Sequence, residues 1–249
     1  MNSVFIFILG LVIGSFLNVV LWRLSQNESF LKGRSYCPHC RKKIFWYDNI
    51  PILSYLILQG RCRQCHKNIS LQYPLIELVS GIIFLWLYLQ LGLSLEFFIA
   101  VILSCFLLII FVYDLKYLLI LDQVVIPAMV IAFLANLYLG FRFWDLVLAA
   151  IIGGGFFGLQ FILSAGRWIG GGDIRLGFLM GLILGVKMLL VALLLAYLSG
   201  AIIGIILIAA GKKKMSSQIP FGTFLSLSTF ITILYGPQLL HWYLNLFNF

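Results

Sequence analysis

Long apolar runs alternate with shorter polar segments along this chain of 249 residues. An α-helix needs roughly 20 apolar residues to cross a bilayer, so runs of this kind predict membrane-spanning helices. We expect eight spans, at residues 3–22, 74–93, 95–113, 123–141, 144–165, 174–187, 188–210 and 221–246. The sixth run is short and rich in glycine, and only Lys187 marks its boundary with the seventh.

Composition agrees with the pattern of runs. Apolar residues make up 63% of the chain, charged residues only 10%, and the mean hydropathy is +1.09. About a quarter of the residues are charged in a typical soluble domain, so this composition excludes a soluble enzyme, a disordered chain and a collagen-like chain. The expected fold class is an all-α integral membrane protein of about eight transmembrane helices, with a small cytoplasmic loop domain between the first two.

The charges indicate how the spans are oriented. The chain has 17 Lys and Arg residues against eight Asp and Glu. Fifteen of these basic residues fall in loops on one side of the expected membrane, at 23–73, 114–122, 166–175 and 211–220. The other side holds only Arg142 and Lys187. Basic loops remain in the cytoplasm, so we expect both termini to face outward. Membrane topology accounts for the excess of positive charge, so we expect no nucleic acid partner.

Two C-x2-C turns lie in the long basic loop and predict a metal site. Cys37 and Cys40 form the first turn, and Cys62 and Cys65 form the second. Four thiolates from two such turns make a tetrahedral site that suits Zn2+. A loop of this size builds little core, so a bound metal would contribute to its folding. Cys105 lies in an apolar run, where packing is the expected role.

Other interpretations of the loop exist. Two disulfides among the four cysteines are one alternative, although a reducing cytoplasm disfavours them, and an iron site is another. His39 and His66 are expected either to face solvent or to lie next to the metal ligands, and not to bind the metal themselves. The basic residues of the loop also suit anionic lipid headgroups. They are Arg41, Lys42, Lys43, Arg61, Arg63 and Lys67.

Two acids at the cytoplasmic ends of spans are candidates for catalysis. Asp114 ends the third span, and Asp173 follows three glycines at the start of the sixth. Acids among apolar helices are costly, so they usually have a partner or a function. The plain alternative is that Asp114 pairs with Lys116 and Asp173 with Arg175, but residues two apart on a helix do not face each other. The three glycines predict an open, irregular turn that lines a wet cavity.

Two carboxylates brought together can share one proton. One then activates water as a base, and the other polarises the scissile carbonyl as an acid, as in an aspartic protease. A Ser-His-Asp set, an H-E-x-x-H motif and a P-loop are all absent from the sequence. Asp122 is expected to cap the start of the fourth span and is not counted as catalytic.

Several motifs in order resemble the type IV prepilin peptidase family, which combines a leader peptidase with an N-methyltransferase. The opening resembles the family at Gly14 to Val20 followed by Arg23. The loop follows it in a series of short motifs, Cys37 to Cys40, Asp48 to Pro51, Leu53 to Leu56, Gly60 to Cys62 and Tyr73 to Glu77. Asp114 to Asp122 resembles the first acidic motif, and Gly170 to Asp173 fits the GxGD motif. One departure is Leu121, where the family commonly has proline.

The resemblance implies an activity and a substrate. Members cleave the short basic leader of prepilins after a glycine, on the cytoplasmic side of the bacterial cell membrane, and then methylate the new amino terminus with S-adenosylmethionine. Asp114 and Asp173 match the catalytic aspartates, and the four cysteines match the zinc site. Glu77 and Arg23 are candidates for binding the methyl donor.

The expected organisation has three parts. Residues 1–22 form the first transmembrane helix, 23–73 form a zinc-ribbon-like loop to which the methyltransferase function is assigned, and 74–249 form a seven-helix peptidase core in contact with membrane lipids. Two alternatives are a presenilin-like protease that cuts inside spans, and a non-enzymatic transporter or scaffold with a metal-bound docking loop.

Overall fold

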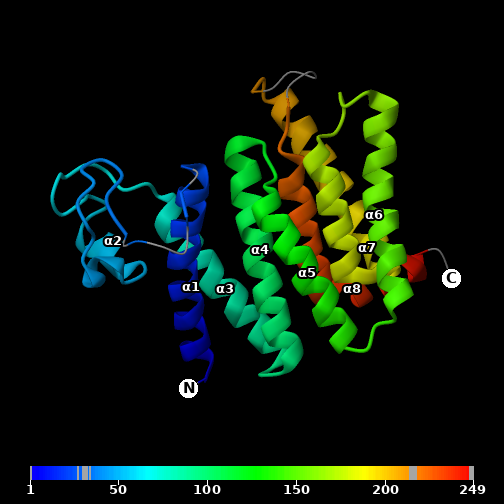
Figure 1. The fold of residues 1–249 in the computed structure, drawn as a ribbon, viewed down its shortest axis with the longest axis horizontal. Helices are drawn as coiled ribbons and strands as arrows, with labels where there is room; N and C mark the ends of the chain where they lie inside the picture. The colour runs from blue at the N-terminus through cyan, green and yellow to red at the C-terminus, as the bar shows by residue number, and fades with distance from the viewer. Residues whose placement is uncertain (1, 27, 30–32, 34, 213–217, 247–249) are drawn as a thin grey trace. The chain divides into compact units, whose positions relative to one another are not determined.

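A computed structural model of the chain describes all residues except 1, 27, 30–32, 34, 213–217 and 247–249 (Figure 1). Lys32, Arg34, Lys213 and Lys214, which contribute to the predicted charge bias, lie outside the described residues. The elements are α1 (Asn2–Ser25), the 3-10 helix η1 (Trp46–Asn49), α2 (Leu53–Ile57), α3 (Gln72–Leu91), α4 (Leu95–Tyr117), α5 (Asp122–Tyr138), α6 (Phe143–Ser164), α7 (Gly171–Ala209) and α8 (Phe221–Leu246).

The chain divides into two units, Met1–Val101 and Ile102–Phe249, and the boundary falls within α4. The predicted all-α class is confirmed: the described residues contain helices and two isolated β-bridges, but no strands. Six of the described helices are long and apolar enough to cross a membrane, and α5, with 17 residues, is shorter.

Helix α7 contains a break that the sequence predicts. It runs over 39 residues, but Gly185 has φ 68° and ψ 172°, which no helix accommodates. The break lies two residues before the expected boundary at Lys187. An unbroken helix of this length would extend about 58 Å, far more than a bilayer core of about 30 Å. With the two parts of α7 counted separately, the described residues contain eight apolar helical segments, the number predicted.

A buried side-chain amide binds the backbone carbonyls next to the break. Asn136 on α5 donates hydrogen bonds from Nδ2 to the carbonyl oxygens of Leu182 at 2.5 Å and Ile183 at 3.1 Å. Because these carbonyls precede Gly185, they face the end of a helix and lack the usual intrahelical partners. Backbone that is irregular at membrane depth needs such substitutes, since lipid offers no hydrogen bonds.

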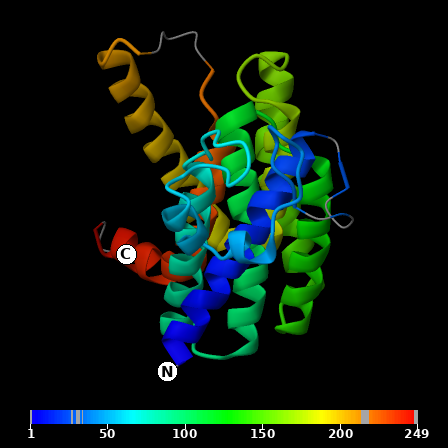
Figure 2. The same ribbon diagram turned by 90° about the vertical axis from the view of Figure 1, so that its left-hand side faces the viewer.

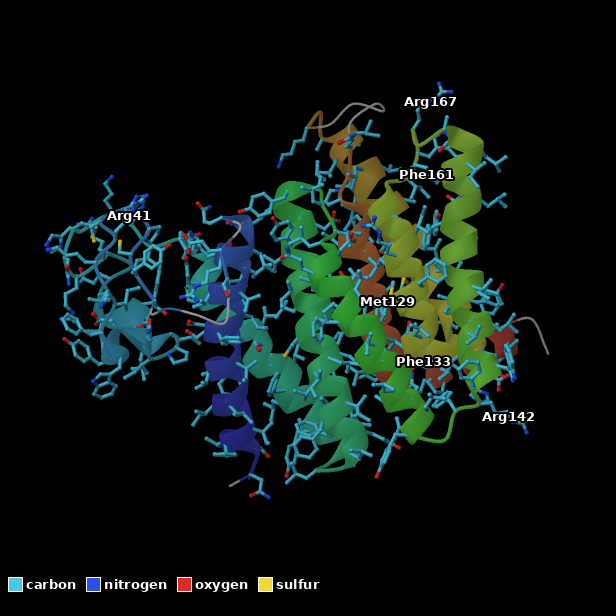
Figure 3. The ribbon with its side chains drawn as sticks, viewed as in Figure 1. Arg41, Met129, Phe133, Arg142, Phe161 and Arg167 are labelled. Carbon is cyan, nitrogen blue, oxygen red and sulfur yellow. The ribbon has the colours of Figure 1, made fainter. Side chains whose placement is uncertain are left out.

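The arrangement of the second unit agrees with the predicted sides of its loops. Arg142, before α6, and Arg167, after α6, lie at opposite ends of this unit (Figure 3). The orange C-terminal part of α7 returns to the end at which Arg167 lies (Figure 1). The two parts of α7 therefore run in opposite directions, as two separate spans would.

Helices α6 and α7 cross at glycines that have no room for a side chain. A Cβ atom on Gly153 would lie 2.2 Å from the carbonyl oxygen of Gly177. A Cβ atom on Gly181 would lie 2.2 Å from the carbonyl oxygen of Ala149. Small residues that allow backbones to approach closely are a common means of packing membrane helices. This crossing fixes the first part of α7, which carries Asp173.

We predict that Gly153→Ala destabilises the protein by about 1–3 kcal/mol, because the added methyl group must push the two helices apart. Gly155→Ala is the matched control on the same helix, since nothing lies within 4 Å of its Cβ position. Thermal unfolding of the purified protein in detergent measures both. Equal melting temperatures for the two variants would contradict the close crossing.

Candidate active site and metal centre

The structure gathers the four predicted cysteine ligands into one cluster. The Sγ atoms of Cys37, Cys40, Cys62 and Cys65 all lie within 4.8 Å of one another, and none is in a disulfide. Sγ of Cys37 and Sγ of Cys65 are 3.9 Å apart. Four sulfur ligands at about 2.3 Å from a Zn2+ ion would lie about 3.8 Å apart, so the cluster fits this ion.

The two cysteine turns are copies of one local structure. In each turn the first cysteine donates its N–H to the carbonyl five residues later, at 3.0 Å for Cys37 and 2.9 Å for Cys62. The residue after the second cysteine has positive φ in both, 55° at Arg41 and 56° at His66. One isolated β-bridge closes each turn. His39 and His66 are exposed, as predicted.

The turns act on the cysteine thiols through backbone amides and burial. Hydrogen bonds from the N–H groups of Cys65 and Gln64 lower the pKa of the Cys62 thiol to about 7. Burial raises the pKa of the Cys37 thiol to about 11. Amides that point at sulfur favour the thiolate form, which is the form that binds a metal.

Asp114 lies in the last turn of α4 and is buried at 5% exposure. Its Oδ2 atom accepts a hydrogen bond from the backbone N–H of Thr223, at 2.9 Å. Thr223 is in the first turn of α8, where N–H groups have no partner within the helix. A Cβ atom on the neighbouring Gly222 would lie only 2.9 Å from Oδ2. The start of α8 therefore holds this carboxylate, and only glycine fits beside it.

Asp173 is the third residue of α7 and is buried at 9% exposure. Its Oδ2 atom accepts a hydrogen bond from the N–H of Gly170, at 3.1 Å. The prediction of an open, irregular turn over the three glycines is wrong. Only Gly170 is extended, and the helix begins at Gly171, because the Asp173 carboxylate caps its N-terminus.

One apolar side chain links the surroundings of both acids. A Cβ atom on Gly172, next to Asp173, would lie 2.8 Å from Cβ of Ile120, and one on Gly222 would lie 2.9 Å from Cδ1 of Ile120. Ile120 thus packs against the first turns of both α7 and α8. The two carboxylates lie close enough to interact electrostatically. The structure therefore brings the predicted pair together, and adds Ile120 and the start of α8 to it.

Asp122 does not act as the predicted cap. The N-cap of α5 is Leu121, which makes no side-chain capping bond, and Asp122 is the first helical residue. Its carboxylate instead forms an ion pair with Arg175 of α7, and both side chains are about half exposed. Arg175 is thus paired with Asp122 and not with Asp173. A partner 53 positions away replaces the local capping bond.

Arg23 and Glu77 are both buried in the first unit, and both hold backbone groups of the loop. Arg23 donates to the carbonyl oxygens of Ser29 at 3.2 Å and Gly33 at 3.0 Å. Glu77 accepts a hydrogen bond from the N–H of Ile52 through Oε2, at 2.8 Å. These contacts shape the loop. Binding of a methyl donor by the two residues stays a prediction.

Comparisons with known proteins agree with this arrangement. Residues 8–91 match the Bacterial Peptidase A24 N-terminal domain, and residues 101–205 match the Type IV leader peptidase family. A prepilin leader peptidase/N-methyltransferase of Bacillus subtilis is 32% identical, over 97% of each chain. One of Aeromonas hydrophila is 34% identical, over 97% of this chain and 93% of its own. This chain belongs to the type IV leader peptidase family.

Membership confirms the resemblance that the motifs indicate. It favours the leader peptidase over a presenilin-like protease and over a non-enzymatic transporter or scaffold. The two matched segments leave residues 92–100 between them, next to the boundary of the two units within α4. No solved structure matches this chain.

We predict one Zn2+ per chain, bound by the four clustered thiolates. Elemental analysis of the purified protein should give stoichiometric zinc, and Cys40→Ser should lose it because three thiolates bind the ion less tightly. Cys105→Ser is the control, since that thiol lies within α4 and outside the cluster. Protein without metal and with two disulfides, purified under reducing conditions, would overturn the prediction.

Proposed function

We propose that this protein is a prepilin leader peptidase and N-methyltransferase. It cleaves the basic leader of a prepilin or pseudopilin after a glycine, and then methylates the new amino terminus. The observation that carries the proposal is the buried pair Asp114 and Asp173, each held by the N–H groups of a helix start. Both residues fall within the segment that matches the leader peptidase family.

The proposed cleavage uses the pair as one unit. One carboxylate removes a proton from a water molecule, and the water oxygen attacks the carbonyl carbon of the scissile peptide. The other carboxylic acid donates its proton to the carbonyl oxygen as the tetrahedral intermediate forms. The N–H of Thr223 donates a hydrogen bond to Oδ2 of Asp114 and holds this carboxylate in place. The start of α8 is therefore proposed to orient Asp114.

The active site is proposed to face the cytoplasm. Asp114 and Asp173 border the loops 114–122 and 166–175, which carry basic residues, whereas Arg142 lies at the end of this unit opposite Arg167 (Figure 3). Basic loops stay on the cytoplasmic side of a membrane. A multi-pass protein of the bacterial cell membrane with this orientation meets the basic leader of a prepilin on the cytoplasmic side, where its positive charge keeps it.

Zinc and the methyl donor are assigned to the loop 23–73. The four thiolates would hold Zn2+ and hold the two cysteine turns together, a structural role. S-adenosylmethionine would supply the methyl group. Arg23 and Glu77 bind backbone groups of the loop, so their proposed contribution to methylation is to position the loop.

We predict that Asp114→Asn and Asp173→Asn each reduce cleavage by at least about a thousandfold, and that the double variant is little worse, because the pair acts as a unit. Asp145→Asn is the control, since Asp145 is an exposed acid in the first turn of α6. Cleavage of a prepilin peptide by each folded variant is the measurement. Substantial turnover in either single variant would remove the pair from the mechanism.

The two activities should separate in variants. Cys62→Ser breaks the zinc site in the loop, while the helices that carry the acids are held by packing. We expect it to impair methylation of a pre-cleaved pilin more than cleavage. Asp173→Asn should do the converse. If Cys62→Ser lowers both rates equally, the loop belongs to the protease site or is essential to the fold, and the division fails.

A further inference from the structure

The loop domain, residues 35–71 between α1 and α3, exposes large apolar side chains that a water-facing domain would bury. Four of those on η1 and α2 form what we name the apolar face: Trp46 at 77% exposure, Leu53 at 57%, Leu56 at 65% and Ile57 at 71%. Exposed apolar side chains gathered on adjacent short elements indicate an interaction surface. The position of this face along α1 and α3 indicates what it interacts with.

A buried carboxylate fixes the depth at which the apolar face begins. The N–H of Ile52, the residue before α2, donates to Oε2 of Glu77 at 2.8 Å. Glu77 is the sixth residue of α3, which places it about 7.5 Å inside this apolar helix. A Cβ atom on Gly14 of α1 would lie 2.7 Å from Cα of Glu77, so the two helices are in contact at this level. The chain therefore enters α2 at the level of Glu77, inside the ends of the two apolar helices α1 and α3 and not beyond them.

The turn that enters α2 is strained, and the bond to Glu77 holds it. Ile52 has φ 61° and ψ −51°, and the N–H of Leu53 donates to the carbonyl oxygen of Pro51 at 2.6 Å. This is a three-residue turn with positive φ, which is rare and costly for a β-branched residue. Such a turn persists only where surrounding contacts impose it. Here it redirects the chain alongside α1 at the depth of Glu77.

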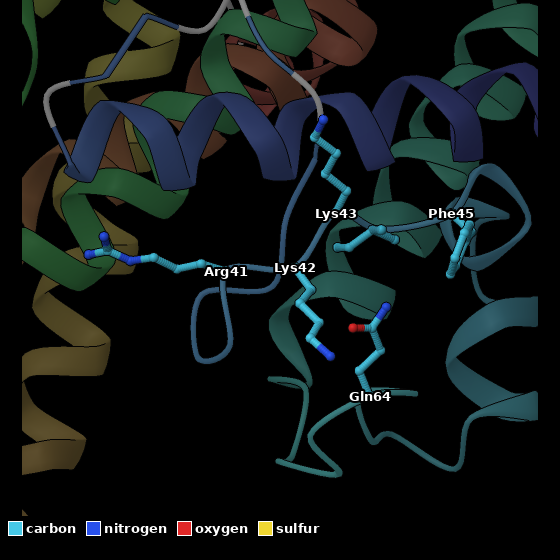
Figure 4. A pocket seen from close by; sticks show the side chains of 6 residues that line it. Arg41, Lys42, Lys43, Phe45 and Gln64 are labelled. Carbon is cyan, nitrogen blue, oxygen red and sulfur yellow. The ribbon is translucent and has the colours of Figure 1, made fainter.

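The basic part of the loop domain lies at a different level. Arg41, Lys42 and Lys43 line a pocket of about 500 Å³ with Phe45 and Gln64 (Figure 4). Arg41 is level with the C-terminal end of α1, whereas α2 lies beside the middle of α1 (Figure 3). The view turned by 90° keeps α2 at the same level (Figure 2). Along the direction of α1, Arg41 thus lies nearer to the C-terminal end of this helix than α2 does.

We propose that the loop domain is embedded in the cytoplasmic leaflet. The apolar face inserts among the acyl chains, and Arg41, Lys42 and Lys43 bind the phosphates of anionic phospholipids. Apolar and aromatic side chains below a basic layer are the pattern of an interfacial membrane segment. The proposal adds a lipid site to the proposed function and does not depend on the catalytic assignment of the two aspartates.

Trp46 supplies a probe of the proposal in the intact, zinc-loaded protein in lipid nanodiscs. Its emission is obtained by subtracting the spectrum of Trp46→Phe from that of the unchanged protein. We expect phospholipids brominated on their acyl chains to quench this emission, and aqueous iodide to leave it. Trp168, obtained in the same way from Trp168→Phe, is the matched control. It is 74% exposed on the loop before α7, and iodide should quench it.

Two results for Trp46 would overturn the proposal. Quenching by iodide without quenching by brominated lipid would mean that the face meets water. Quenching by neither would mean that protein covers it. For the basic layer, brominated phosphatidylglycerol at a fixed fraction should quench Trp46 at least about twofold more than brominated phosphatidylcholine. The triple variant Arg41→Gln, Lys42→Gln, Lys43→Gln should lose this preference, and a preference kept in that variant would exclude the three residues as the lipid site.

Discussion

A carboxylate at the end of an apolar helix must find hydrogen-bond donors within the protein, because lipid provides none. In this chain the starts of helices provide them. The first turn of α8 donates to Asp114, and the N-cap of α7 donates to Asp173. Both helix starts approach through glycines that Ile120 packs against. The requirement to pair two acids thus determines where α4, α7 and α8 meet, and the proposed site is the place where they do.

The same requirement explains two other irregular parts of the structure. At Gly185 the helix breaks, and the amide of Asn136 donates hydrogen bonds to the carbonyl oxygens that the break leaves without helical partners. Before α2 the chain turns through a strained Ile52, and Glu77 accepts a hydrogen bond from the N–H of this residue. At both positions, one polar side chain from a neighbouring helix binds the irregular backbone.

The sequence predicted features that depend on local pattern. Hydropathy and charge predicted the helical class and placed the break in α7 within two residues, and spacing predicted the cysteine cluster that the structure assembles. Features that depend on distant partners were missed. The donor to Asp114 is a backbone N–H 109 positions away, which leaves no side-chain signature. Asp122 was predicted to be a local cap because its actual partner, Arg175, is remote in sequence. The sequence did not predict the apolar face because polar residues dominate the loop around it.

Mass spectrometry of one reaction shows whether this protein cuts a prepilin next to its basic leader. The purified, zinc-loaded protein is incubated with a synthetic prepilin, with and without S-adenosylmethionine. We expect a single cut after the leader glycine in both samples, and the added mass of a methyl group on the new amino terminus only where the methyl donor is present. An uncut peptide, or a cut within the apolar helix of the substrate, would contradict it.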